Sequence, residues 1–562
     1  MSFVDQILSK LESSNETVLA ELREPVFKVS GRELLDRITR VRAFLASRGL
    51  KEHDRCALLA ANSIDWIATN LAIMAEGLIA VPLYSRQAPS ELVAMMKDCS
   101  PALICCGDAA LRDGILQAWP EAPPQALFAE IFADEDSRAA APAPRQMSAP
   151  HNLGDSNVVT IIYTSGTSGE PKGVMLTAGN VAHILQCTSA QLDVLMKQGS
   201  GTASSRADLV YQWAPLNFAA AWITTLTGLL RGSSISLNTD LSKLATELRS
   251  VAPDYFVNVP ALLERIRRAV DEQLWKTGGI VRAIYTSAKS AYMRKHEGRS
   301  KSADSIWLAA ANVGVFPTIR KKMIGDHLKA LICGSAPLNV ETQLFFMMLG
   351  IPVLQVYGLT ETTAICTMDN PRHVEPGRVG RAISGVEMKL GENDEIIVRG
   401  PNIFPGYWNR PEETAKVLRD GWFHTGDQGE VNSAGNWKIV GRIKNLIILN
   451  SGHNIAPEPI EVEILNRINN VPHAVLIGNG RSYLSLLVTG PVTAEQVQSA
   501  LDAVNAELPH YEQVRAFRIL SEPFTIENGL LTANGKLKRD LLAQRFQQEI
   551  EDIYALKQTG VA

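Results

Sequence analysis

Three features are missing from the sequence, and each absence excludes a class of protein. The seven cysteines of the 562 residues form no C-x-x-C pair, and their odd number argues against a complete disulfide framework. The ten histidines follow no zinc-binding spacing such as H-E-x-x-H, so we expect no structural zinc. No run of 18 uninterrupted apolar residues occurs, which predicts that no segment crosses a membrane and leaves a peripheral membrane contact open.

An excess of positive charge is missing as well. The chain has 55 Lys and Arg against 59 Asp and Glu, a formal net charge of −4, which argues against nucleic acid as the main partner. The first residues include Asp5 and Glu12 and lack the basic start and apolar run of a secretory signal. We therefore expect a cytoplasmic location.

Alternating apolar runs and helical patterns begin at about residue 54. We expect strands at 56–59, 78–83 and 102–106, with helices at 66–74 and 90–97 between them. Such alternation is typical of a parallel α/β sheet. A second α/β stretch covers about 157–360 and includes strands at 234–237 and 331–333.

Four further regions complete the expected organisation. Residues 138–150 are rich in Ala and Pro and indicate a linker or surface loop, and residues 276–305 are basic and polar and indicate a solvated insertion. Short strand and turn signals at 378–440 predict a small β-rich subdomain. Residues 443–562 hold two helix–strand alternations that could form a small separate α+β domain. We therefore predict an α/β fold whose larger N-terminal part consists of parallel α/β subdomains and the small β-rich subdomain.

A loop of hydroxyl residues and glycines follows the apolar strand 158–163. It consists of Thr164, Ser165, Gly166, Thr167, Ser168, Gly169, Glu170, Pro171, Lys172 and Gly173. Its N–H groups and hydroxyls can surround a polyphosphate, and Lys172 adds a positive charge. The same residue types also make ordinary surface turns. A P-loop NTPase is disfavoured because the Gly-Lys-Ser/Thr of a Walker A loop is absent.

This loop resembles the phosphate loop of the adenylate-forming superfamily, which includes acyl-CoA synthetases, firefly-type luciferases and the adenylation domains of peptide synthetases. Five later segments resemble further motifs of the superfamily, in its order. They are Gly334-Ser335-Ala336-Pro337, Tyr357-Gly358-Leu359-Thr360-Glu361, Gly421 to Asp427, Gly441-Arg442-Ile443-Lys444 and Asn534-Gly535-Lys536. The resemblance covers about residues 20–550. It implies that the chain activates a carboxylic acid with ATP, releases pyrophosphate and forms an acyl-adenylate.

The resemblance also assigns residues to the nucleotide. Residues 164–169 and Lys172 would hold the phosphates, and residues 334–337 with Tyr357 and Gly358 would line the adenine pocket. Asp427 would accept hydrogen bonds from both ribose hydroxyls, and Arg442 would reach the ribose. The structural alternatives are a core tyrosine at 357, a turn-forming aspartate at 427 and a surface ion pair at Arg442.

The resemblance makes Lys172, Thr360, Glu361 and Lys536 the catalytic residues and Lys444 the hinge. Glu361, after Thr360, would bind Mg²⁺, an ion that takes few protein oxygens and several phosphate oxygens. Lys536 would stabilise the crowded transition state between two anions, the substrate carboxylate and the α-phosphate. Lys444 occupies the position of the superfamily's hinge residue, which lets the C-terminal domain swing between two half-reactions. The resemblance therefore implies a large adenylation domain at 1–442 and a small mobile α+β domain at 443–562. Solvated side chains are the alternative reading of both lysines.

The segment 211–231 bears on the acid. It contains no Asp or Glu, which the ammonium group of an amino-acid substrate would need as a partner. Its apolar residues suit an acyl chain, at about 0.8 kcal/mol per buried CH₂. Phe218 and Trp222 are the candidate pocket residues, because Trp222 falls where some long-chain synthetases carry a tunnel-gating tryptophan; a plain core aromatic is the alternative. The segments 400–407 and 451–457 also resemble long-chain synthetases, so we expect a medium-to-long-chain fatty acid.

Three departures from the superfamily concern the acceptor. Phe218 stands where many acyl-CoA synthetases have a histidine, His453 replaces a usual lysine, and Asn445 replaces an aspartate. Coenzyme A is the expected acceptor. Because the departures touch the thioester-forming face, the phosphopantetheine thiol of an acyl carrier protein stays open as the alternative. A catalytically inactive protein that binds a nucleotide or acyl-AMP is the non-enzyme alternative, and nothing in the sequence points to a luciferase-like oxygenase.

Overall fold

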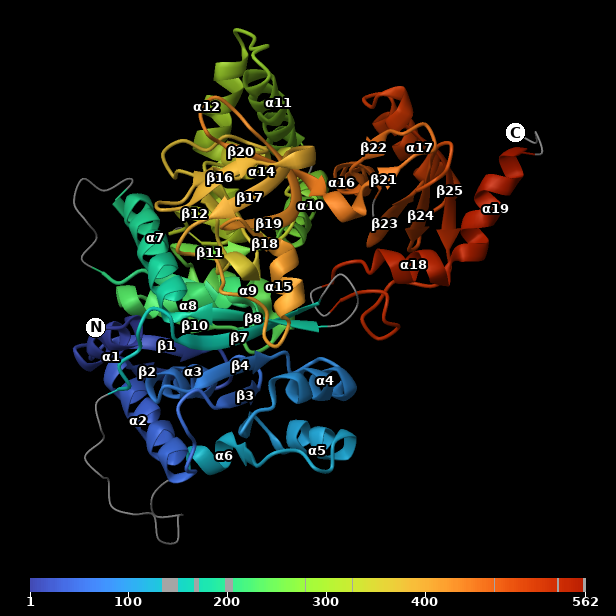
Figure 1. The fold of residues 1–562 in the computed structure, drawn as a ribbon. Helices are drawn as coiled ribbons and strands as arrows, with labels where there is room; N and C mark the ends of the chain where they lie inside the picture. The colour runs from blue at the N-terminus through green and yellow to red at the C-terminus, as the bar shows by residue number, and fades with distance from the viewer. Residues whose placement is uncertain are drawn as a thin grey trace. The chain divides into compact units, whose positions relative to one another are not determined.

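The computed structural model describes residues 1–133, 150–165, 171–197, 206–277, 279–325, 327–468, 471–532 and 535–558 (Figure 1). Most of the expected linker at 138–150, the centre of the hydroxyl-rich loop from Gly166 to Gly169, and Asn534 lie outside these residues. The chain forms two compact units. The first contains Met1–Met388, Val398–Phe423 and Ser433–Trp437, and the second contains Lys389–Ile397, His424–Asn432 and Lys438–Ala562.

A six-stranded sheet in the first unit has the order β6-β5-β3-β4-β7-β8. Its strands are β3 (Arg55–Leu59), β4 (Ile79–Leu83), β5 (Leu103–Cys106), β6 (Gln125–Leu127), β7 (Val158–Ser165) and β8 (Pro171–Thr177). All pairs are parallel except β7 with β8. The connecting and flanking helices are α2 (Gly31–Ser47), α3 (Ile64–Ala75), α4 (Pro89–Cys99), α5 (Ala109–Ala118) and α6 (Phe128–Ile131). The strands and helices expected between residues 54 and 106 are thus confirmed.

A nine-stranded sheet in the same unit has the order β15-β14-β13-β12-β11-β9-β10-β1-β2. Its strands are β1 (Thr17–Glu21), β2 (Phe27–Ser30), β9 (Leu209–Gln212), β10 (Ser234–Leu237), β11 (Tyr255–Asn258), β12 (Ala330–Cys333), β13 (Val353–Tyr357), β14 (Thr367–Met368) and β15 (Arg381–Ala382). The central pairs from β1 to β13 are parallel. Helices of this region include α1 (Phe3–Glu12), α7 (Ala178–Lys197), α8 (Ala219–Arg231), α9 (Leu244–Val251) and α14 (Val340–Met348). Both expected strands, 234–237 and 331–333, are present.

The expected solvated insertion at 276–305 is helical and only its outer side is solvated. It contains the end of α10 (Pro260–Thr277), all of α11 (Gly279–His296) and the start of α12 (Asp304–Gly314), and α13 (Phe316–Met323) follows it. Tyr285 and Ala288 of α11 are buried in a hydrophobic cluster of the first unit. The expectation was therefore wrong for the inner side, because a narrow stripe of Tyr and Ala is hidden among many basic residues in the sequence.

The expected β-rich subdomain is a five-stranded sheet of order β16-β17-β19-β18, with β20 paired to β19. Its strands are β16 (Glu387–Leu390), β17 (Glu395–Arg399), β18 (Leu418–Arg419), β19 (Trp422–Val431) and β20 (Trp437–Arg442). The short helix α15 (Pro411–Val417) precedes β18. Burial alternates along the first part of β19, as expected for a strand with one covered face.

The C-terminal part of the second unit is a small α+β domain, as expected. A two-stranded ladder, β21 (Ile447–Ile448) with β22 (Asn454–Ile455), accompanies the sheet of β23 (His473–Ile477), β24 (Leu484–Thr489) and β25 (Val514–Leu520). Hydrophobic clusters form around this sheet with α16 (Pro457–Arg467), α17 (Ala494–Asn505), α18 (Arg539–Arg545) and α19 (Gln547–Gln558). The predicted boundary between residues 442 and 443 and the mobility of the domain stay predictions.

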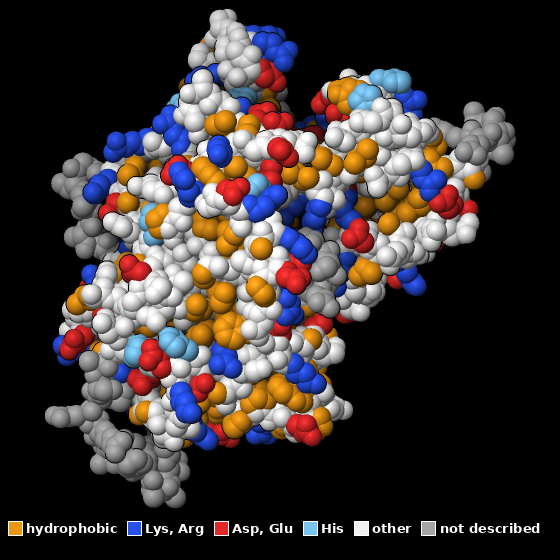
Figure 2. All heavy atoms as spheres, viewed as in Figure 1, with side chains coloured by type: hydrophobic (Ala, Val, Ile, Leu, Met, Phe, Trp, Pro, Cys, Tyr) orange, Lys and Arg blue, Asp and Glu red, His pale blue; other side chains and the backbone are white. Residues whose placement is uncertain are grey.

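Charged side chains of both signs are spread over the face seen in Figure 2, in keeping with the nearly balanced charge of the chain. Among the helices of the described ranges, none is both long and apolar enough to cross a membrane.

Candidate active site

The two ends of the hydroxyl-rich loop lie side by side on the antiparallel strands β7 and β8. Thr164 is the register partner of Lys172, and Ser165 is the partner of Pro171. Gly173 packs so tightly that a Cβ there would lie 2.7 Å from Ile161 Cγ2. The structure therefore confirms the strand before the loop and places Lys172 opposite Thr164, while the phosphate-binding role of the loop stays a prediction.

Two of the predicted adenine segments follow neighbouring parallel strands. Residues 334–337 follow β12. Tyr357 is the last residue of β13, and Gly358 follows it. The two strands are paired, with Cys333 of β12 opposite Gln355 of β13. Gly334 lies close to β13, since a Cβ there would be 2.7 Å from Val356 Cγ2. The carboxyl ends of adjacent parallel strands are where open α/β sheets form ligand crevices. The ring of Tyr357 is buried at this edge.

A tight turn presents Glu361 just beyond β13. The short helix η3 spans Thr360–Thr362, and Gly358 must be glycine because a Cβ would lie 2.2 Å from the carbonyl oxygen of Ala364. The fully buried Asn402 donates hydrogen bonds from Nδ2 to the carbonyl oxygens of Thr362 and Ile365, at 3.3 and 3.0 Å. The backbone N–H of Phe404 donates to the carbonyl oxygen of Glu361 at 2.9 Å. The segment 400–407 thus fixes the turn from outside.

Tyr407 connects Glu361 with Lys172. Its backbone pairs with Val174 of β8 in an antiparallel bridge, and its hydroxyl donates a 2.8 Å hydrogen bond to Glu361 Oε1. Lys172 Nζ lies 5.3 Å from the centre of the Tyr407 ring, within the range of a cation–π contact. Residues from three distant parts of the chain therefore meet beside the base of the loop. Tyr407 was noted in the sequence only as part of a resembling segment, and its role was missed.

Glu413, on α15, is the direct partner of Lys172. Lys172 Nζ lies 2.5 Å from Glu413 Oε2, and Lys416 pairs with the other carboxylate oxygen. The hydrogen bond from Lys172, followed by that from Lys416, lowers the pKa of Glu413 to about 2. The carboxylate is therefore ionised at any working pH. Nothing in the sequence pointed to this residue, because a glutamate on a short exposed helix carries no pattern.

The donor set fits a magnesium–nucleotide complex better than a metal held by protein alone. Across the described residues, no group of three or more His, Cys, Asp or Glu side chains could hold a metal ion. Mg²⁺ in nucleotide sites uses one or two carboxylates and the substrate's phosphate oxygens. The half-buried Glu361, close to Lys172 and the base of the loop, offers one such carboxylate.

In the second unit, the predicted ribose residues form an ion pair with each other. Arg442 Nε lies 2.6 Å from Asp427 Oδ1, and the Asp427 side chain is only 5% exposed. The part of β19 before Asp427 is held by Glu395, which accepts a hydrogen bond from the Gly426 N–H at 2.9 Å and contacts His424 Nδ1 at 2.8 Å. A fixed carboxylate at a buried position within this strand can accept hydroxyl donors. The ribose contacts of both residues stay predictions.

Lys444 and Lys536 both lie in the second unit and affect each other electrostatically. Burial, followed by the positive charges of Arg442 and, more weakly, Lys536, lowers the pKa of Lys444. Lys536 follows Gly535, whose φ of +72° is the left-handed conformation that suits glycine. The Lys536 backbone N–H donates to Thr532 Oγ1 at 3.1 Å. The turn presents an exposed lysine, while the catalytic and hinge roles stay predictions.

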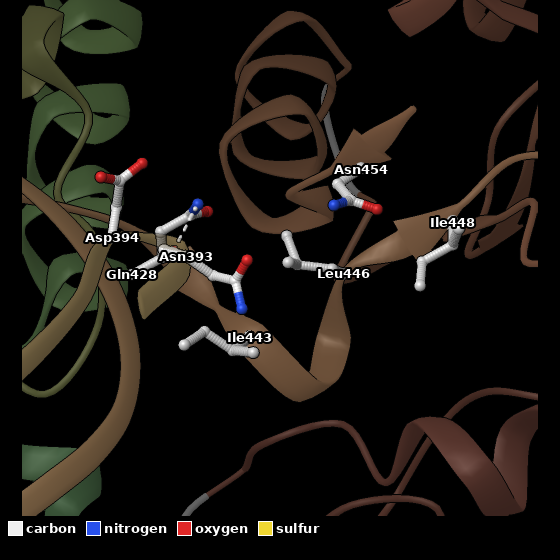
Figure 3. Close-up of a pocket in the computed structure, with 7 residues that line it drawn as sticks. All are labelled: Asn393, Asp394, Gln428, Ile443, Leu446, Ile448 and Asn454. Atoms are coloured by element: carbon white, nitrogen blue, oxygen red, sulfur yellow. Dashed lines mark hydrogen bonds between the residues drawn. The ribbon is translucent and has the colours of Figure 1, made fainter. Parts of the chain in front are cut away.

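A pocket of about 380 Å³ lies within the second unit (Figure 3). It is lined by Asn393, Asp394, Gln428, Ile443, Leu446, Ile448 and Asn454. Gln428 Nε2 donates to the carbonyl oxygen of Asn393 at 3.2 Å. None of the predicted nucleotide or acid residues lines this pocket, so it adds nothing to the candidate active site.

The predicted acid residues lie on α8. Phe218 is the residue before the helix, and its ring centre lies 5.8 Å from that of Tyr84. Trp222 is only 1% exposed and donates a 2.8 Å hydrogen bond from Nε1 to Oδ1 of the buried Asn70 on α3. The structure therefore places Trp222 inside the core between α8 and α3, and its contact with substrate stays a prediction.

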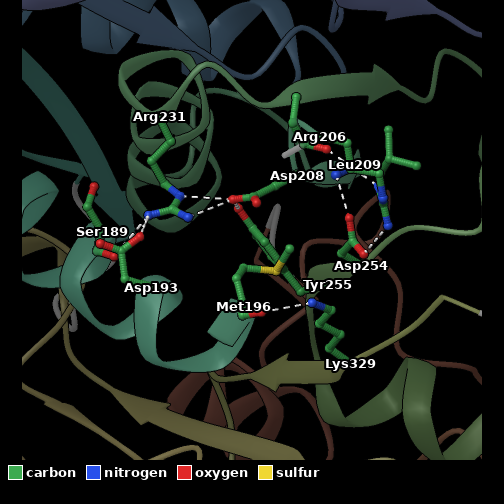
Figure 4. A network of polar contacts seen from close by, with 11 residues as sticks. Ser189, Asp193, Met196, Arg206, Asp208, Leu209, Arg231, Asp254, Tyr255 and Lys329 are labelled. Carbon is green, nitrogen blue, oxygen red and sulfur yellow. Dashed lines mark hydrogen bonds and ion pairs between the residues drawn. The ribbon is translucent and has the colours of Figure 1, made fainter. Parts of the chain in front are cut away.

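Charged residues anchor the far end of α8 (Figure 4). Arg231 pairs with Asp193 of α7 at 2.6 Å and with Asp208 at 2.8 Å. The buried Asp254 next to β11 pairs with Arg206 at 2.7 Å and accepts the backbone N–H of Leu209 at 2.8 Å. This network fixes α8 against α7 and β9, and thereby fixes the helix that carries the candidate acid residues.

Family models match both parts of the chain. The model described as "AMP-binding enzyme" matches residues 12–408, and the model described as "AMP-binding enzyme C-terminal domain" matches residues 444–558. The first match alone covers more than half of the chain.

Curated proteins with similar sequences are named as fatty-acid ligases. The long-chain-fatty-acid–CoA ligase FadD15 of Mycobacterium bovis is 26% identical over 548 residues, covering 91% of this chain and 89% of that protein. The putative fatty-acid–CoA ligase fadD11 of Mycobacterium tuberculosis is 31% identical over 437 residues, covering 71% of this chain and 74% of that protein.

Solved structures share the fold over nearly the whole length. ATP-bound MatB from Rhodopseudomonas palustris is 23% identical with a TM-score of 0.72 and covers 97% of this chain and 99% of its own. A Mycobacterium tuberculosis fatty acyl CoA synthetase is 20% identical with a TM-score of 0.64 and covers 98% of this chain and 99% of its own. At these identities the likeness establishes the fold alone. The chain therefore belongs to the AMP-binding enzyme family, the adenylate-forming superfamily that its motifs resemble, and is an AMP-forming ligase similar to acyl-CoA synthetases.

Proposed function

We propose that this protein activates a medium-to-long-chain fatty acid with ATP and transfers the acyl group to the thiol of coenzyme A. The main observation that supports the first half-reaction, activation with ATP, is that Lys172, Tyr407 and Glu361 meet beside the base of the hydroxyl-rich loop. The names of the fatty-acid–CoA ligases of similar sequence support the acid and the acceptor.

Adenylation needs charge to be balanced where two anions meet. Lys172 and the loop residues would bind the phosphates. Glu361 would hold Mg²⁺, which would supply positive charge for the leaving pyrophosphate. Lys536 would act on the acid carboxylate and the α-phosphate and stabilise the transition state more than the separated reactants. Asp427 and Arg442 orient the ribose, and residues 334–337 with Tyr357 and Gly358 hold the adenine.

The second half-reaction uses another face of the C-terminal domain. Residue 444 acts as the hinge, and the boundary near residue 442 separates the part that binds nucleotide from the part that moves. His453 replaces the lysine usual in long-chain relatives, and its ring stacks on Tyr511 at 4.3 Å between ring centres. This altered surface keeps the phosphopantetheine thiol of an acyl carrier protein as the second candidate acceptor.

The acid is expected to be apolar because α8 offers no buried carboxylate to an ammonium group. Phe218, the residue before α8, and Trp222, within it, are the proposed pocket residues. Each methylene buried there contributes about 0.8 kcal/mol.

The direct test is pyrophosphate release over a panel of saturated acids, with coenzyme A and a holo acyl carrier protein supplied in turn. The proposal expects release to increase with chain length and AMP to accumulate with coenzyme A. Equal pyrophosphate release for all chain lengths would contradict a medium-to-long-chain acid as the substrate. AMP formation with the carrier protein alone would make the carrier protein, and not coenzyme A, the acceptor. Absence of ATP–pyrophosphate exchange with every acid would support the non-enzyme alternative.

A further inference from the structure

Helix α12 turns an apolar face to solvent. Its inner side is formed by Asp304 and Ala311, which are buried. On the opposite side, at helical spacing, Ile306 and Val313 are 69% and 86% exposed, and Trp307 beside them is 39% exposed. No charged residue occurs between positions 305 and 319. An amphipathic surface helix ordinarily carries polar residues on its outer face, so this arrangement is unusual for a helix bounded by water.

Further apolar side chains are exposed near the end of α10 and the start of α11. Trp275 is 62% exposed, Ile280 is 78% exposed and Val281 is 41% exposed. The guanidinium carbon of Arg282 lies 4.4 Å from the centre of the Trp275 ring. Helices α11 and α12 lie side by side, and their inner sides join one hydrophobic cluster (Figure 1). Their outer sides are therefore exposed together, and we call the exposed apolar residues on α10–α12 the hairpin face.

The helices that carry most of the hairpin face have a net positive charge. Residues 279–323 contain nine Lys and Arg against two Asp and Glu, a net charge of +7 in a chain whose total is −4. Both acidic residues are already paired within the region, Asp304 with Arg294 and Glu297 with Arg299. Lys and Arg side chains are visible beside the tip of the α11–α12 hairpin in Figure 2. Exposed indoles and aliphatic groups among unbalanced positive charges are therefore concentrated on one part of the first unit.

We propose that the hairpin face docks the protein on the surface of an anionic lipid bilayer. Tryptophan and aliphatic side chains enter the headgroup region, while the surrounding Lys and Arg attract anionic headgroups. A second copy of the chain fits less well, because self-association would bring two surfaces of the same strong positive charge together. An acidic protein partner would be recognised through the charged residues and would leave the exposed apolar face of α12 without a function.

Vesicle sedimentation with the full chain, without ATP or acid, tests the proposal. The wild type should bind vesicles of phosphatidylcholine and phosphatidylglycerol, and should not bind phosphatidylcholine alone. The double variant Ile306→Ser, Trp307→Ser should bind on the order of tenfold more weakly, because two large apolar groups no longer leave water. The control, Leu116→Ser with Val431→Ser, removes two exposed apolar side chains elsewhere, each about as exposed as Trp307 (39% and 42% against 39%), and should bind as the wild type does.

The electrostatic part is tested by charge reversal. The variant Lys295→Glu, Lys301→Glu should lose most of its binding to anionic vesicles and its dependence on salt. The control Lys28→Glu, Lys51→Glu makes the same change in net charge on exposed residues outside the helical insertion. It should keep its binding to anionic vesicles and the salt dependence of that binding.

Several outcomes would overturn the proposal. The hairpin face does not dock on lipid if the wild type fails to bind anionic vesicles. The same holds if the Ile306→Ser, Trp307→Ser and Lys295→Glu, Lys301→Glu variants bind as well as the wild type. A dimer in sedimentation velocity that the Ile306→Ser, Trp307→Ser variant converts to a monomer, without vesicle binding, would assign the face to a second copy. Because vesicle binding requires no turnover, its failure would leave the proposed ligase activity untouched.

Discussion

Tyr407 donates its hydroxyl proton to Glu361 Oε1 at 2.8 Å, although the two residues are 46 positions apart. A hydrogen bond to a charged group contributes about 1.5–3 kcal/mol. Tyr407→Phe removes this bond and keeps the ring under Lys172, so we expect the KM for MgATP to rise about tenfold with a smaller effect on the KM for the acid. ATP–pyrophosphate exchange at varied MgATP measures the effect. Tyr511→Phe, in the second unit, is the control, and an unchanged KM in Tyr407→Phe would show that Glu361 needs no support.

Glu413 holds the ammonium group of Lys172, so under the proposed phosphate role of Lys172 it would compete with the phosphates. The carboxylate lies 2.5 Å from Lys172 Nζ, and its pKa is lowered to about 2, so the pair persists at any working pH. Glu413→Gln removes this competitor, and we expect the KM for MgATP to fall about two- to fivefold, as suits a solvent-exposed pair. Equilibrium binding of a non-hydrolysable ATP analogue should show the same gain.

Glu412→Gln is the matched control for this experiment. Glu412 is an exposed carboxylate on the same helix. If Glu412→Gln raises the affinity for the nucleotide as much as Glu413→Gln does, the effect comes from general surface charge and not from the pair with Lys172. A rise in KM with Glu413→Gln would mean that the carboxylate positions Lys172 instead of competing for it.

Sequence patterns predicted this site unevenly, and the reason is physical. Strands such as β3, β4 and β12 are short buried apolar runs bounded by turns, so their positions could be predicted. Glycines that permit close backbone approach, such as Gly358, lie inside recognisable motifs. The contacts of Lys172 with Tyr407 and Glu413 depend on tertiary packing between distant segments, which no local pattern encodes. The inner side of α11 was missed for a similar reason, since burial of Tyr285 depends on its neighbours in space.

Lys536→Ala should separate the two half-reactions. We expect formation of acyl-AMP to fall about 100-fold or more, because removal of one group that stabilises transition-state charge typically has such an effect. Attack of the thiol on pre-made acyl-AMP should change little. Single-turnover kinetics of both steps give the comparison, and Lys538→Ala, two residues along the chain, is the control. Equal loss in both steps would contradict the assignment of Lys536 to adenylation alone.

Asp369 should make the stability of the first unit depend on pH. Burial raises the pKa of this carboxyl from 3.8 to about 7, although it accepts the backbone N–H of Gln355 at 2.8 Å. The folded state therefore holds the proton more tightly than the unfolded chain, so stability from this group is complete below about pH 4 and is lost as pH rises towards 7. Asp369→Asn should melt at a higher temperature than the wild type at pH 8, and the difference should shrink at pH 5.

Calorimetric melts at the two pH values decide this prediction. Asp36→Asn, at an exposed position on α2, should show no difference that varies with pH. A wild type whose melting temperature rises between pH 5 and 8 relative to Asp369→Asn would contradict the raised pKa.

Trp222 and Trp66 are both fully buried tryptophans, and this makes them a matched pair for testing the acid pocket. Trp222→Phe removes the hydrogen bond to Asn70 Oδ1 and frees space on α8, at a cost of about 1–3 kcal/mol in the free energy of unfolding for the unpaired amide. If Trp222 borders the acyl chain, kcat/KM should shift towards longer acids by about fourfold for each methylene that the new space accepts. Trp66→Phe on α3 also removes volume from the core, yet should leave the order of preferred acids unchanged. A profile that stays the same in Trp222→Phe would identify Trp222 as a core residue, whose hydrogen bond to Asn70 joins α8 to α3.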